Sequence, residues 1–128
     1  MTHHTLTPEM QNCIESCKAC HDVCLQTAMT DCLETGGTHV EPDHFRLMLN
    51  CAELCQTSAN FMLSNSSMHA VVCAACADVC NACAASCDRV GDMDACADTC
   101  RRCATDCATM GAMAGQARAA GAARQAAH

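Results

Sequence analysis

The sequence is poor in aromatic and aliphatic residues. Its 128 residues include two Phe but no Trp and no Tyr, so no set of aromatic rings is available for stacking on nucleic-acid bases. Leu, Ile, Val and Phe together number only 16, and so low a fraction is usually a sign of disorder. Here the missing volume can be supplied by 16 Cys, because Cys is itself a small buried hydrophobe.

Positive charge and long apolar runs are also scarce. The formal net charge is −7, which argues against DNA or an anionic membrane as a partner. No apolar run approaches the roughly 20 residues of a membrane span. The first residues, MTHHTLTPEMQNC, lack the basic and apolar regions of a secretory signal. We therefore expect a cytoplasmic protein of one domain, in a compartment where thiols stay reduced.

The cysteines are concentrated in four segments, where they follow one another in steps of 3 and 4, with one step of 8 before Cys32. Steps of 3 and 4 place side chains on one stripe of an α-helix, whereas a strand face needs steps of 2. The pattern predicts helices near 8–34, 43–65, 68–90 and 93–111. Their short connections make neighbouring helices antiparallel.

The predicted fold is all-α: an up-down-up-down antiparallel four-helix bundle over residues 8–111 with a Cys-lined core. Residues 1–7 form an N-terminal segment, and residues 112–128 form an Ala-, Gly- and Arg-rich tail that could extend the fourth helix. Cys32 is one residue out of phase with the others. The core cysteines are Cys13, Cys17, Cys20, Cys24, Cys32, Cys51, Cys55, Cys73, Cys76, Cys80, Cys83, Cys87, Cys96, Cys100, Cys103 and Cys107.

So many inward cysteines exceed what packing requires, because Leu fills a core better. One alternative is a disulfide-stapled or redox-active helical protein, since residues at i and i+4 lie about 5–6 Å apart. An iron–sulfur site is weaker, because its ligands usually come from loop motifs of the type CxxCxxC…CP, which this sequence lacks. A Zn(II) tetrathiolate site carries a net charge of −2, and several such sites in one dry column would be costly to bury.

Cu(I) fits the cysteine pattern best. It is a soft ion that prefers thiolates, and one thiolate can bridge two ions. Each Cu(I) that displaces one thiol proton leaves the charge of the core unchanged, so the bundle can load many ions per chain. No Ser-His-Asp, Cys-His or paired-carboxylate arrangement is readable, so no enzymatic activity is expected.

Four cysteine motifs carry a resemblance to a known family: CIESCKACHDVC (13–24), CAELC (51–55), CAACADVCNACAASC (73–87) and CADTCRRCATDC (96–107). With these motifs, the sequence resembles the cytosolic branch of the bacterial copper storage proteins. The resemblance implies a four-helix bundle filled with Cu(I)–thiolate clusters, commonly assembled as a homotetramer. It also implies storage rather than transfer or catalysis, with the sixteen cysteines as ligands.

Further Met and His residues fall on the inner stripes and are candidates for additional copper ligands or for groups that admit copper to the core. Met as gap-filler and His as an ordinary satisfied polar residue are the alternatives. One set gathers at each end of the bundle, and either end could admit copper. The candidates are His44, His69, Met10, Met48, Met62 and Met110.

Residues outside the stripes have other expected roles. His21 follows Cys20 directly and should point away from the core. Every seven residues, an apolar side chain recurs beside the cysteines of the second helix, which predicts a subunit interface. The stripe consists of Val40, Leu47, Leu54 and Phe61. The acids are expected on solvated faces without a metal role; they include Asp22, Asp78, Asp88, Asp98 and Asp106.

Overall fold

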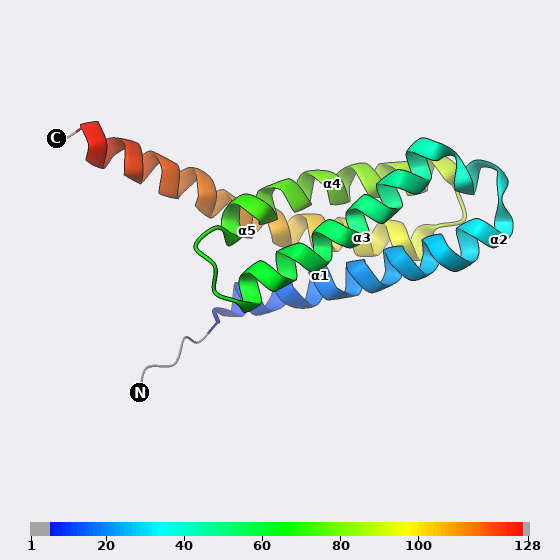
Figure 1. Cartoon of the computed structure of the whole chain (residues 1–128), viewed down its shortest axis with the longest axis horizontal. Coiled ribbons are helices and arrows are strands. Elements are labelled where there is room, and N and C mark those ends of the chain that lie inside the picture. The colour runs from blue at the N-terminus through cyan, green and yellow to red at the C-terminus, as the bar shows by residue number, and fades with distance from the viewer. Residues whose placement is uncertain (1–5, 127–128) are drawn as a thin grey trace.

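The computed structural model describes the backbone of residues 6–126 and the side chains of residues 6–113. The predicted segments 1–7 and 112–128 therefore lie partly outside the described residues. The described part is helical, and its long helices run antiparallel to their neighbours (Figure 1). They are α1 (Pro8–Thr27), which continues through a π-helix (Ala28–Cys32) into α2 (Leu33–Thr35), then α3 (Pro42–Leu63), α4 (His69–Val90) and α5 (Asp94–Ala126). The predicted up-down-up-down bundle is confirmed.

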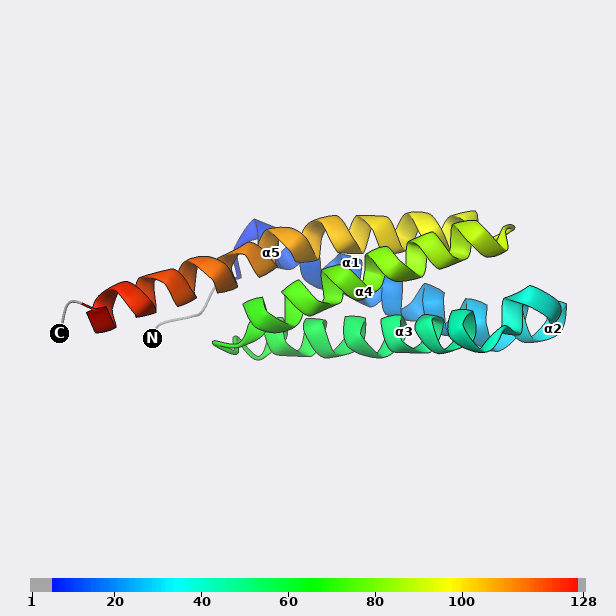
Figure 2. The same cartoon turned by 90° about the horizontal axis from the view of Figure 1, so that it is seen from above.

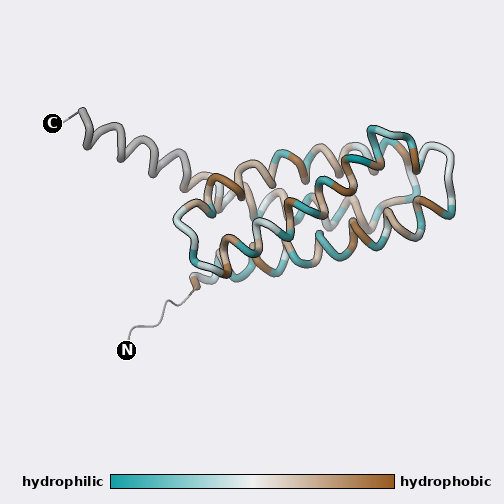
Figure 3. Tube along the Cα trace, in the orientation of Figure 1, coloured by the Kyte–Doolittle hydropathy of each residue, from teal (hydrophilic) through white to brown (hydrophobic). Residues whose placement is uncertain are grey.

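The helices are arranged in the order α1, α3, α4, α5 around the bundle. The strongest packing joins α4 to α5 and α1 to α3, and the ring closes through α3 with α4 and α1 with α5. Figure 2 shows the same two pairs from above. Figure 3 shows hydrophilic and hydrophobic residues alternating along α1 and α3, as expected for helices with one face on a core.

Local sequence signals fix several helix ends. Thr7 Oγ1 accepts a hydrogen bond from the backbone N–H of Met10 at 3.1 Å, and Pro8 stands at the first helical position of α1. Pro42 opens α3 in the same way, because Pro has no N–H to lose at that position. Gly91 ends α4 with φ of +85°, a conformation that favours glycine.

The π-helix explains why Cys32 looked out of phase in the sequence. A π-helical turn holds an extra residue, so the step of 8 between Cys24 and Cys32 spans the same rotation as a step of 7 in an α-helix. Cys32 is thereby fully buried. Thr30 Oγ1 donates to the Gln26 carbonyl at 2.6 Å beside this turn. The prediction of an out-of-phase Cys32 was wrong because it assumed an uninterrupted α-helix.

Helix α5 continues well past residue 111, the predicted end of the fourth helix, and extends beyond the other helices in Figure 1. Where it crosses α4, Gly111 is buried and lies so close that a Cβ there would be 2.7 Å from the Cα of Ala74. Two small residues therefore allow the backbones of α4 and α5 to approach each other.

Helix α4 is long and apolar enough to cross a membrane by length and composition, with a mean hydropathy of 1.7 in its most apolar window. The expectation that no segment reaches this length was therefore wrong. The apolar character comes from Ala, Val and five Cys, and all five cysteines of α4 are buried in the bundle.

Candidate metal centre

The core of the bundle is a column of thiols. All sixteen cysteines are free, and each is at most 2% exposed. They come from all four long helices, because the steps of 3 and 4 turn one stripe of each helix inward. The sulfur atoms of neighbouring cysteines lie 3.4–4.0 Å apart, a distance of thiol contact.

Twelve of the cysteines form four groups, and within each group all the sulfur atoms lie within 4.8 Å of one another. They are Cys17, Cys76, Cys103 and Cys107; Cys20, Cys24, Cys51 and Cys100; Cys20, Cys55, Cys80 and Cys103; and Cys13, Cys73 and Cys107. We call these twelve residues the thiol column. Cys20, Cys103 and Cys107 each belong to two groups, so neighbouring groups share ligands. Shared thiolates are what bridged Cu(I) clusters require.

Hydrogen bonds between thiols shift the pKa values of the cysteines in the column. Contacts with Cys100, Cys20 and Cys24 lower the pKa of Cys51. Contacts with Cys107 and Cys17 similarly lower the pKa of Cys103, because a donated hydrogen bond stabilises the thiolate. A thiolate in the dry core is therefore stabilised by the hydrogen bonds of the thiols around it.

Cys32 lies outside the four groups and behaves as an ordinary buried thiol. Burial raises its pKa to about 11, and the nearby Cys87 and Cys96 add to this effect. It keeps its proton at neutral pH, so copper binding there must displace that proton.

Four cysteines lie outside the thiol column, namely Cys32, Cys83, Cys87 and Cys96, and the last three contact Met48. Met48 is fully buried, and its Sδ lies 3.6 Å from the Sγ atoms of Cys83 and Cys87 and 3.8 Å from that of Cys96. Of the predicted Met residues, Met48 thus lies among cysteine sulfurs. Met10, Met62 and Met110 are buried in the helix segments of the opposite end.

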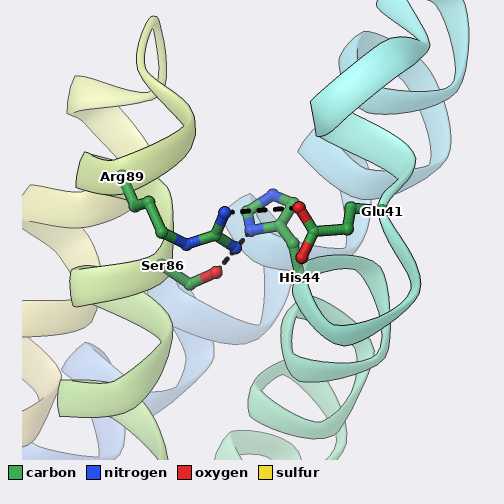
Figure 4. Close-up of polar contacts among 4 residues, drawn as sticks. All are labelled: Glu41, His44, Ser86 and Arg89. Carbon is green, nitrogen blue, oxygen red and sulfur yellow. Dashed lines mark hydrogen bonds and ion pairs between the residues drawn. The ribbon is translucent and has the colours of Figure 1, made fainter.

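His44 is fully buried beside this group. Its Nδ1 lies 2.8 Å from Ser86 Oγ, and its Nε2 has no hydrogen-bond partner in the part of the chain that the structure describes. Burial, more than any nearby charge, lowers the pKa of His44, so the ring is neutral. Figure 4 shows the ring between α3 and α4, next to the ion pair of Arg89 with Glu41.

The other two predicted histidine positions differ from His44. His69 is half-buried, and its Nδ1 donates to the carbonyl of Ser66 at 2.8 Å, while its buried Nε2 has no partner within residues 6–113. His21 lies outside the thiol column, as predicted, but it is not a free surface residue. Its Nδ1 donates to the Ala52 carbonyl at 2.7 Å and ties α1 to α3.

Serine partners were missed in the sequence. Ser86 directly precedes Cys87, so its contact with His44 requires knowing how α3 and α4 face each other. Ser16 is buried and donates to Asp106 across α1 and α5, so Asp106 is not simply a solvated acid as expected. Asp88 pairs with Arg101 on the surface.

A four-helix bundle with buried thiols on all four helices defines a class of protein that holds soft metal ions in its interior. Residues 6–112 match the model of the copper storage protein family, Csp. The chain belongs to this family.

Solved structures agree with that assignment. The Nmul_A1745 protein of Nitrosospira multiformis is 53% identical, with a TM-score of 0.81, and the match covers 82% of this chain and 96% of that one. Cu(I)-bound copper storage protein BsCsp3 is 34% identical with a TM-score of 0.74, covering 80% and 98%. A cysteine-rich protein of Bacillus subtilis (strain 168), YhjQ, described as uncharacterized, is 37% identical over 77 residues, or 60% of this chain and 70% of its own length.

Proposed function

We propose that this chain stores Cu(I) in the cytoplasm by binding many ions per chain to its sixteen cysteines. Family membership supports copper storage, and the thiol column carries the assignment of the ligands, since its twelve sulfurs form overlapping groups within 4.8 Å. Thiolate is the softest donor that proteins offer and suits Cu(I).

The core can accept copper without a growing charge. Each Cu(I) replaces one thiol proton, so the charge of the column is the same before and after loading. Four Zn(II) tetrathiolate sites would instead add several buried negative charges. The bundle therefore favours Cu(I) over Zn(II) by electrostatics as well as by softness.

We propose that the chain assembles as a homo-oligomer, a tetramer by resemblance to the family, and has no catalytic activity. The apolar stripe supports an interface: Val40, just before α3, and Leu47 and Leu54 on α3 pack against the core and are only partly buried, and Phe61 is half-buried as well. The remaining apolar surface on this stripe is available to a second copy. Copper ions are the small ligands, and no nucleic-acid or membrane partner is proposed.

An anaerobic titration tests the proposed storage. Reduced apo-protein is mixed with increasing Cu(I) in competition with a Cu(I) chelator, and copper and thiols are measured on the same sample after gel filtration. We expect close to sixteen titratable thiols and about ten or more Cu(I) per chain, because thiolates can bridge ions. Saturation at one or two ions would reject storage. Near-zero thiols in freshly prepared protein would favour the disulfide-stapled alternative.

A further inference from the structure

The core contains two chemically different regions. The thiol column offers only thiols, whereas the region around Met48 combines a thioether and an imidazole with three cysteines. Met48 and His44 are i and i+4 on α3, so their side chains lie on the same face, one turn apart. Three sulfurs from α4 and α5 converge on Met48 Sδ at 3.6–3.8 Å.

Packing alone does not account for these contacts. A Met that fills a gap needs only apolar neighbours, yet here Cys83, Cys87 and Cys96 all direct their thiols at the sulfur atom. A thioether accepts these weak hydrogen bonds without carrying a charge. It is therefore a soft donor that adds nothing to the negative charge of the site.

The imidazole of His44 provides the second neutral donor. The ring is fully buried, and its Nε2 has no partner among the described residues. A buried nitrogen of this kind is costly unless something binds to it. When His44 Nδ1–H donates to Ser86 Oγ, Nε2 keeps its lone pair free, so Ser86 acts as a positioning residue for a ligand nitrogen.

We propose that Met48, His44 and one thiolate, supplied by Cys83, Cys87 or Cys96, form a separate, more weakly binding Cu(I) site that exchanges its ion before the thiol column does. The inference rests on the proposed copper storage. One thiolate, one thioether and one imidazole balance the charge of Cu(I), whereas sites in the column have two or more thiolates. Fewer anionic sulfurs mean weaker binding, and weaker binding of one ion appears mainly as faster release.

The site is placed for exchange with the column and with the outside. Cys96 Sγ lies 3.8 Å from Met48 Sδ and 3.6 Å from Cys24 Sγ, so one thiolate reaches both regions. Figure 4 shows the ion pair of Glu41 and Arg89, whose side chains are partly exposed, beside His44. An ion can therefore pass between the column and the Met48 site through Cys96.

Release kinetics test the proposal. Fully Cu(I)-loaded protein is mixed anaerobically with excess bathocuproine disulfonate, and formation of the chelate is followed. We expect a fast phase of about one Cu(I) per chain, released about tenfold or more faster than the rest. Met48→Leu should remove this phase and leave the slow phase unchanged, because the substitution conserves volume. Met48→Cys should convert the fast phase into slow release.

Met62→Leu is the matched control, since Met62 is equally buried on the same helix but at the opposite end. A fast phase that persists in Met48→Leu, or that disappears equally in Met62→Leu, would overturn the proposal. A second readout does not depend on any variant's folding: selenium-edge absorption of selenomethionine-labelled, copper-loaded protein should show copper bonded to selenium. Its absence would also overturn the site. Low total capacity would instead reject the storage function itself.

Discussion

Removing two cysteines should have a different effect on copper capacity depending on where they lie. Cys103 and Cys107 belong to three of the four sulfur groups, whereas Cys83 and Cys87 belong to none of them. Cys103 Sγ lies 3.7 Å from the sulfurs of Cys17 and Cys55. We therefore compare Cys103→Ala/Cys107→Ala with Cys83→Ala/Cys87→Ala, two variants that lose the same number of thiols.

The size of the difference follows from shared ligands. The four groups contain fifteen ligand places, and Cys103 and Cys107 occupy four of them. The first variant should thus lose about a quarter of its copper, because bridging thiolates serve more than one ion. The second should lose about one ion, the one assigned to the Met48 site. If capacity simply followed thiol number, each variant would lose one eighth, or two of sixteen sulfurs.

Copper per chain is measured after anaerobic loading and gel filtration, with far-UV circular dichroism confirming that both variants remain helical. Each buried Cys→Ala change removes one sulfur atom and costs about 1 kcal/mol of folding free energy, similar in the two variants. Equal copper losses would refute the shared-ligand reasoning. Complete loss of binding in either variant would show that the column fills as one cooperative unit.

Three further outcomes are expected. Gly111→Ala places a Cβ 2.7 Å from Ala74 Cα and should lower the melting temperature of the apo-protein by about 5–10 °C. Ala108→Ser, a substitution at an exposed position of the same helix, should leave the melting temperature unchanged. Equal melting temperatures for the two variants would contradict the close contact. Burial raises the pKa of Cys32 from 9.0 to about 11, so its contribution to the free energy of unfolding is complete below pH 9 and is lost as the pH rises to 11. Urea titrations should therefore show that the difference in unfolding free energy between wild type and Cys32→Ala falls over that interval. A difference that rises instead would refute this reasoning. Reduced, metal-free protein should already give a helical circular-dichroism spectrum, since protonated Cys is an adequate core residue, and a coil spectrum that becomes helical only with copper would contradict this.

The sequence was sufficient for the fold because the cysteines mark the inner face of every helix. The spacing of Cys13, Cys17, Cys20 and Cys24 predicts one stripe of an α-helix. Each such stripe must pack against another helix to be buried. Thr7-Pro8 and Pro42 also predicted helix starts to within a residue.

The errors arose where one residue's position depends on another helix or on a departure from regular geometry. The π-helix before Cys32 has no sequence signature as clear as a Pro or Gly, so its phase was misjudged. The contact of Ser86 with His44 depends on how α3 and α4 pack, which periodicity does not specify. The continuation of α5 to Ala126 was one of two options, because Ala favours a helix while Gly opposes it.

Anomalous diffraction at the copper edge, from crystals of the Cu(I)-loaded protein, tests the central claim most directly. It locates each ion without assuming which residues bind it. We expect more than about ten peaks per chain inside the bundle, between the sulfurs of the thiol column and beside Met48, because each thiolate can serve two ions. One or two peaks, or copper bound mainly to surface histidines and carboxylates, would contradict storage in the thiol-lined core.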